Sequence, residues 1–138
     1  MLADARGVVL GLVIAPANRH DIKLAIPTLD SVPVHRPQPR PRRPQHLCAD
    51  KAYHDQAFRK RLRLRHFVAH IKSRGEEILE HKQRPHVKAR RWVIERTQSW
   101  FNRFRRVLIR WEKKEENYQA ILEFVAGWIA FRAAGVLG

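Results

Sequence analysis

Apolar residues come first as a short continuous run near the start of the chain. The run from Val8 to Ala15 (VVLGLVIA) is rich in β-branched residues and has the length of a strand. Such a run predicts a central strand that is covered on both faces. The polar stretch Asn18 to Asp21 then predicts a turn that leads into a short helix from about Ile22 to Leu29.

A second group of short elements follows a connecting segment. Residues 33–44 are rich in proline and arginine, which predicts an extended and solvated internal loop. His46 to Ala49 predicts a strand, Asp55 to about Arg65 a basic helix, and Phe67 to Ile71 another strand. A polar loop through Gly75 and Pro85 should follow.

The second half of the chain has helical periodicity. One helix is predicted from Val87 to Trp111 and another from Tyr118 to Ala134. At 100° per residue, one stripe of the first helix should face the core; it comprises Val93, Trp100, Phe104, Leu108 and Trp111. The chain is therefore expected to be an α/β protein with a helical C-terminal half and no internal repeat.

Glu95 lies on the opposite side of this predicted helix. It shares that side with Arg91, Ser99, Asn102 and Arg106, and it is the only acid between Val87 and Trp111. An exposed ion pair with Arg91 is one interpretation, worth about 0.3 to 0.5 kcal/mol. The other is a carboxylate metal ligand beside arginines that bind phosphate.

A metal site would need a second carboxylate, and Asp50 is the candidate. It follows the predicted strand His46 to Ala49 directly, and ligand-binding residues of open α/β sheets lie at such strand ends. A zinc site at His46, Cys48 and His54 is a weaker alternative, because no paired cysteine motif is present. Cys48 is expected to be a buried, inert thiol.

Charge indicates the kind of partner. Lys and Arg total 28 against 13 Asp and Glu, a formal net charge of +15, so a polyanion such as nucleic acid is expected. Cys48 is the single cysteine, which excludes an intramolecular disulfide and fits the cytoplasm. Neither an export signal nor an apolar stretch of about 20 residues is present, so no membrane association is predicted.

Three stretches together resemble DDE transposases of bacterial insertion sequences. They are GVVLGLVIAPANRHD, PQHLCADKAYHD and RRWVIERTQSWFNRFRRVLIRWEKKEENYQAIL, and the resemblance covers nearly all of residues 1–138. It implies a ribonuclease-H-like fold, in which a mixed sheet is flanked by helices. It also implies two Asp and one Glu that bind two divalent ions, Mg²⁺ or Mn²⁺. Asp50 would be the second acid and Glu95 the third.

The resemblance also implies what the chemistry acts on. The substrate would be DNA at transposon ends and target sites, cleaved and rejoined near the bacterial nucleoid. Arg91, Arg103 and Arg106 would bind DNA phosphates. Many relatives carry a Tyr, an Arg, the catalytic Glu and a Lys at fixed spacing; this chain keeps Arg91 and Glu95 but has Lys88 and Asn102 at the outer places.

The first catalytic Asp of the family belongs to a strand upstream of Val8 to Ala15. The chain is therefore expected to be the C-terminal part of a catalytic domain, from a truncated gene or a downstream reading frame, and inactive alone. It would pair with the upstream transposase portion or another transposase copy. The alternatives are a non-catalytic basic DNA-binding module, as a transposase inhibitor or relic, and a ribosome-associated basic protein.

Overall fold

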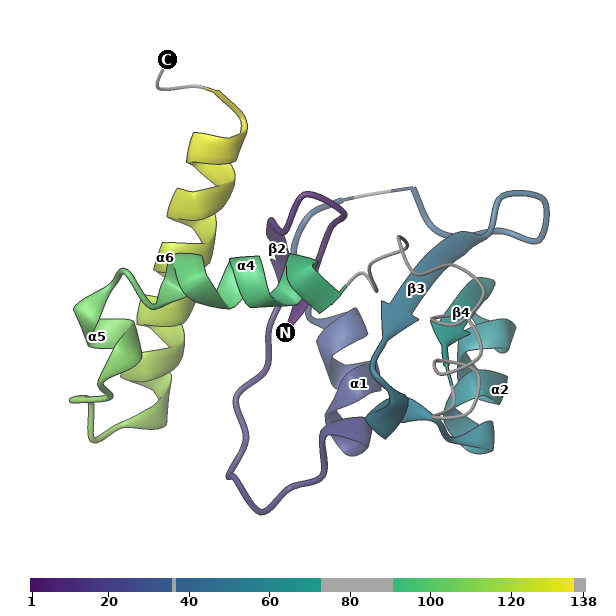
Figure 1. Cartoon of the computed structure of the whole chain (residues 1–138), viewed down its shortest axis with the longest axis horizontal. Coiled ribbons are helices and arrows are strands. Elements are labelled where there is room, and N and C mark those ends of the chain that lie inside the picture. The colour runs from purple at the N-terminus through teal and green to yellow at the C-terminus, as the bar shows by residue number, and fades with distance from the viewer. Residues whose placement is uncertain (36, 73–90, 136–138) are drawn as a thin grey trace, which may run out of the picture. The chain divides into compact units, whose positions relative to one another are not determined.

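The computed structural model describes residues 1–35, 37–72 and 91–135 of the 138 residues (Figure 1). The chain divides into two compact units. The first comprises Met1–Asn18, Leu24–Val34 and Trp92–Gly138, and the second comprises Arg19–Lys23 and His35–Arg91. The predicted loop through Gly75 and Pro85 lies outside the described residues.

The second unit is built on two parallel strands. β3 (Gln45–Ala49) pairs with β4 (Phe67–Ile71) in unbroken register, from Gln45 opposite Phe67 to Ala49 opposite Ile71. The helix α2 (Gln56–Leu64) connects them and packs on β4, as the teal elements of Figure 1 show. Both strands and this helix confirm the elements predicted from the sequence.

Side chains from α2 and β4 form the core of the second unit. Phe58 and Leu62 point inward from α2, and Ile71 lies buried at the end of β4. Asp55 caps α2, because its Oδ1 accepts a hydrogen bond from the Phe58 N–H at 2.6 Å. Before β3, Arg40 and Arg43 pair with each other in a tight turn within the proline- and arginine-rich loop.

The first unit contains a strand pair and most of the helices. β1 (Leu2–Ala3) and β2 (Val9–Gly11) pair antiparallel. α1 (Asp21–Asp30), the helix predicted at this place, begins in the second unit and continues in the first. A short 3-10 helix, η1 (Lys51–Tyr53), belongs to the second unit, and α4 (Arg91–Phe101), α5 (Arg105–Leu108) and α6 (Glu115–Ala133) complete the described elements.

The first predicted strand is much shorter than its apolar run. Only Val9–Gly11 is strand, and among the described residues its sole pairing is with β1. Gly11 lies against the end of α1, where an added Cβ would be 2.8 Å from Ser31 Oγ and 2.9 Å from the Thr28 carbonyl oxygen. The last residue of β2 therefore packs closely on a helix end, and the described strands form two separate two-stranded sheets.

The prediction of one helix from Val87 to Trp111 is wrong. α4 ends at Phe101, a turn follows at 102–104, and α5 then begins after Phe104, whose backbone is extended. Phe101 and Val107 both enter one buried cluster. On a continuous helix these two residues would point about 120° apart around the axis, whereas the break lets both enter one cluster.

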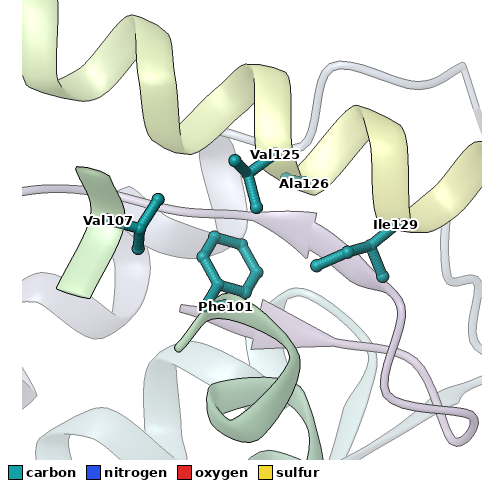
Figure 2. Close-up of a cluster of buried hydrophobic side chains, with 5 residues drawn as sticks. All are labelled: Phe101, Val107, Val125, Ala126 and Ile129. Atoms are coloured by element: carbon teal, nitrogen blue, oxygen red, sulfur yellow. The ribbon is translucent and has the colours of Figure 1, made fainter. Parts of the chain in front are cut away.

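The core of the first unit lies between α6 and the end of α4 (Figure 2). It consists of Phe101, Val107, Val125, Ala126 and Ile129, with Val9 and Leu12 packed against it. The helix break also corrects the predicted core stripe. Val93 is buried and Trp100 and Phe104 are half-buried, but Leu108 and Trp111 are 59% and 66% exposed.

α6 confirms the last predicted helix and starts three residues before the predicted Tyr118. Its first turn carries Glu115 and Glu116 and its last turn Arg132, the arrangement that favours a helix dipole. Among the described residues, no helix is both long and apolar enough to span a membrane.

Candidate functional site

Asp50 stands immediately after β3, as the sequence predicts. Because β3 and β4 are parallel, their carboxyl ends meet at one edge of the sheet, and Asp50 extends from that edge. Its backbone is extended (φ −68°, ψ 162°) and it caps η1, with Oδ1 accepting from the Lys51 N–H at 2.5 Å. The residue is exposed, and the cap holds it at this edge of the sheet.

Tyr53 is a neighbour of Asp50 that the sequence analysis did not select. Its N–H donates to the Asp50 carbonyl oxygen at 2.9 Å, and its ring lies 6.1 Å from that of Phe58. Burial raises the pKa of the Tyr53 phenol above its ordinary value, and the negative charges of Asp21 and Asp50 raise it further. Both carboxylates therefore act on one phenol in the second unit.

Glu95 lies on the exposed side of α4, as predicted. Val93 and Thr97, two residues before and after it, are buried, whereas Glu95 itself is exposed. The other residues predicted on its side, Ser99, Asn102 and Arg106, are exposed as well. The side chain of Arg91 lies outside the described part of the structure, so its pairing with Glu95 remains a prediction.

Of the remaining predicted phosphate ligands, Arg103 is exposed and Arg106 has a partner within the chain. Arg103 stands in the turn between α4 and α5. Arg106 Nη2 lies 3.4 Å from Glu112 Oε1; the arginine side chain is 74% exposed and that of the glutamate 9%. A guanidinium this exposed keeps most of its surface for an anion, while the glutamate holds one end of it.

Arg96, next to Glu95, is a further residue that the sequence analysis missed. Its guanidinium carbon lies 4.6 Å from the centre of the Trp92 ring and 5.1 Å from that of Trp100. It also donates to the carbonyl oxygen of Arg6. The signal in the sequence is a tryptophan four residues before and four residues after an arginine, which places all three on one helix face.

Through these contacts Arg96 attaches α4 to the chain at Arg6, directly beside the candidate carboxylate Glu95. Thr97 adds to this, because its buried hydroxyl lies 2.8 Å from the Gly7 carbonyl oxygen. Gly7 has φ +85°, a conformation that favours glycine, and an added Cβ would lie 3.0 Å from Thr97 Oγ1. Segment 6–7 and α4 are consequently held together around the residues that flank Glu95.

The predicted metal ligands belong to different units, Asp50 to the second and Glu95 to the first. Within the described ranges, no group of three or more His, Cys, Asp and Glu side chains is arranged to hold a metal ion. The two carboxylates have the hard oxygen donors that Mg²⁺ and Mn²⁺ prefer, so the donor chemistry fits the ion. A shared metal site at Asp50 and Glu95 remains a prediction.

Comparison with known families decides what this chain is. A model of the family described as the transposase DDE domain matches residues 1–125, which include both Asp50 and Glu95. The chain belongs to the DDE transposase family. No solved structure gives a significant match to it.

Among curated proteins, this transposase chain is similar to a Burkholderia cepacia protein named as a transposase for insertion sequence element IS402. The two are 30% identical over 129 residues, which cover 89% of this chain. The same alignment covers 57% of the relative, so the chain spans little more than half the length of that protein. The identified family agrees with the resemblance of the three sequence stretches.

Proposed function

We propose that the chain acts in DNA transposition and supplies two carboxylates, Asp50 and Glu95, of a transposase metal site. The observation that carries this proposal is the position of Asp50. In this member of the family, Asp50 is exposed and directly follows a parallel strand. Residues at that end of a strand are the ones that bind ligands in α/β sheets. Glu95 supports the proposal by its outward position on α4.

Each group would have a distinct part in the reaction. A pair of divalent ions at these carboxylates would supply Lewis-acid chemistry for phosphodiester cleavage and strand transfer. Asp50 and Glu95 would hold these ions through their carboxylate oxygens. The exposed Arg103 and Arg106, together with Arg91, would bind DNA phosphates and so fix the position of the DNA without reading its sequence.

The fold of the complete catalytic domain is part of the same proposal. The parallel pair β3–β4, with α2 packed on β4, is compatible with one part of a ribonuclease-H-like mixed sheet. We infer that further strands and another catalytic Asp complete this sheet and its metal site, and that a partner transposase portion or another copy can supply them. On this inference the chain acts on DNA together with that partner.

Calorimetric titration of the chain with Mn²⁺ or Mg²⁺ tests the metal site. We expect binding that is abolished in both Asp50→Asn and Glu95→Gln, because each change removes a charged oxygen ligand. Asparagine also caps helices, so Asp50→Asn should preserve η1. Glu116→Gln, which removes an exposed acid of α6, is the matched control and should bind normally. Metal binding that is unchanged in both Asp50→Asn and Glu95→Gln would contradict the proposal.

The charge of +15 favours a second candidate, a basic DNA-binding module without chemistry that acts as an inhibitor or relic of a transposase. DNA affinity distinguishes the two candidates when it is measured with and without Mn²⁺. If the carboxylates bind metal at the DNA, Mn²⁺ should tighten DNA binding by the chain but not by Glu95→Gln. Equal affinities with and without metal, for both proteins, would favour the module.

A further inference from the structure

The open face of the β3–β4 sheet carries polar side chains that the proposed transposase chemistry does not use. Along each strand, inward residues alternate with exposed ones. The exposed positions are His46 and Cys48 on β3 and Val68 and His70 on β4. In the register of the sheet, His46 stands opposite Val68 and Cys48 opposite His70.

His46 and His70 meet diagonally across this face. Their rings are stacked, with centroids 5.0 Å apart and planes inclined by 24°. His46 Nδ1 lies 2.7 Å from His70 Nε2, so the two imidazoles share one hydrogen bond. A hydrogen bond between two neutral imidazoles leaves one nitrogen as donor and the other as acceptor.

We propose that His46 and His70 form a surface chelate for a transition-metal ion of the zinc class. Two imidazole nitrogens bound to one tetrahedral ion stand about 3.3 Å apart, as follows from metal–nitrogen bonds of 2.0 to 2.1 Å. The observed pair needs to open by only about 0.6 Å to reach that separation. On this proposal, rotation of the two exposed side chains would supply this opening and turn both nitrogens toward the ion.

The strand ladder makes the pair a suitable chelate. Five consecutive register pairs hold the Cα atoms of β3 and β4, so the histidines are positioned before metal arrives. In the described part of the structure no third His, Cys, Asp or Glu joins the pair in a metal-holding group, and on this proposal water would supply the remaining ligands. Cys48 is exposed, so the prediction of a buried thiol is wrong. It lies on the same face of the sheet as the two histidines, but the proposed chelate does not require it as a ligand.

Ligand chemistry separates this site from the carboxylates. Imidazole nitrogen suits Zn²⁺, Ni²⁺ and Cu²⁺, whereas Mg²⁺ prefers oxygen. An ion bound to one strand through His46 and to the other through His70 would link β3 to β4 only four residues before Asp50. The chelate would therefore stabilise the strand pair that positions Asp50, and it requires neither DNA nor the proposed catalysis.

Thermal unfolding of the chain with and without Zn²⁺ tests the chelate, because an ion that binds only the folded state raises Tm. We expect Zn²⁺ to raise the Tm of the wild-type chain, and His46→Gln and His70→Gln each to lose this shift. Measured by calorimetry, either change should weaken Zn²⁺ binding at least about tenfold. Each variant is compared with its own metal-free Tm, so a small change in stability does not obscure the result.

Three controls define the site. His35→Gln removes an exposed histidine elsewhere in the second unit and should keep the Zn²⁺ shift, as should Cys48→Ser and Asp50→Asn. The absence of a Zn²⁺ shift in the wild-type chain would overturn the proposal. So would a shift that survives in both histidine variants, or one that disappears only in Cys48→Ser. Because Asp50→Asn separates the two sites, failure here leaves the proposed transposase metal site to its own test.

Discussion

Thr97 is fully buried on α4, and its hydroxyl joins two distant parts of the first unit. Thr97 Oγ1 lies 2.8 Å from the Gly7 carbonyl oxygen and 2.9 Å from that of Val93. A buried carbonyl that loses its donor costs more than a typical hydrogen bond contributes, because water cannot replace the donor. The position should therefore be sensitive to loss of the hydroxyl even when side-chain volume is kept.

We predict that Thr97→Val lowers the free energy of unfolding by about 1 to 3 kcal/mol. Urea denaturation measures the change. Ser99→Ala, which removes an exposed hydroxyl from the same helix, should stay within about 0.5 kcal/mol of wild type. A Thr97→Val chain as stable as the wild type would show that the hydroxyl contributes nothing to holding segment 6–7.

Ionisation of Tyr53 should make the free energy of unfolding depend on pH in the alkaline range. Its pKa is higher in the folded chain than the ordinary value near 10 of the unfolded chain. The folded state therefore holds the phenol proton more tightly than the unfolded state does. The resulting contribution to the free energy of unfolding is complete below pH about 10 and decreases as the pH rises through the folded pKa. Deprotonation would place a charged phenolate in a partly buried position and next to the negative charges of Asp21 and Asp50, and both effects raise the pKa.

At alkaline pH the free energy of unfolding of Tyr53→Phe should not show the decrease that ionisation of Tyr53 causes in the wild type. Urea unfolding at pH 8 and pH 11 should show the difference in stability between wild type and variant moving in favour of the variant at the higher pH. Comparing the pair at each pH removes the contribution of lysines and other groups that titrate in both proteins. A difference that does not change with pH would contradict the prediction.

At the scale of elements, α2 shows how a local signal fixes a boundary. Asp55 has an extended backbone (φ −135°, ψ 135°) and its carboxylate accepts from the Phe58 N–H, while basic residues occupy the last turn. The cap satisfies a backbone donor that has no partner inside the helix. The negative charge at the start of the helix and the positive charges in its last turn interact favourably with the helix dipole. The boundary of α2 was for this reason predictable.

Asp55→Ala should reduce the free energy of unfolding by about 0.5 to 2 kcal/mol through loss of the cap. Asp55→Ser, which keeps a capping oxygen, should recover most of that loss. Chemical denaturation followed by circular dichroism measures both variants. Equal stability of the alanine and serine variants would mean that the side-chain oxygen is not what stabilises the helix end.

At the scale of the whole molecule, each compact unit has its own buried side chains. Phe58, Leu62 and Ile71 form the interior of the second unit, while Phe101 and its neighbours form that of the first. Leu62 is fully buried at 0% exposure, but Leu64 on the same helix is 71% exposed. These two leucines give a matched pair for measuring what burial contributes.

Leu62→Ala should cost about 2 to 5 kcal/mol, because it removes buried methyl groups and leaves a cavity. Leu64→Ala should change the free energy of unfolding by less than about 0.5 kcal/mol. Equilibrium unfolding in urea, followed for both variants, measures the difference. Similar losses in the two variants would show that Leu62 is not part of a packed interior.

The sequence by itself determined the elements whose signals are local. β3, α2, β4 and α6 follow from apolar periodicity and from capping residues such as Asp55. The same signals place Asp50 after a strand and Glu95 on the exposed side of a helix, because both depend on neighbours within a few residues. Family membership was also readable from the stretches around these two acids.

Tertiary packing decided the rest. The 102–104 break contains no glycine or proline that would predict it, and the residues on either side of it, Phe101 and Val107, are buried in one cluster with α6. The run Val8 to Ala15 contains only a three-residue strand, and Gly11 at its end packs on a helix end. His46 meets His70 24 positions away, and Arg96 reaches Arg6 90 positions away. Such contacts join distant residues, and no local pattern records which of them will meet.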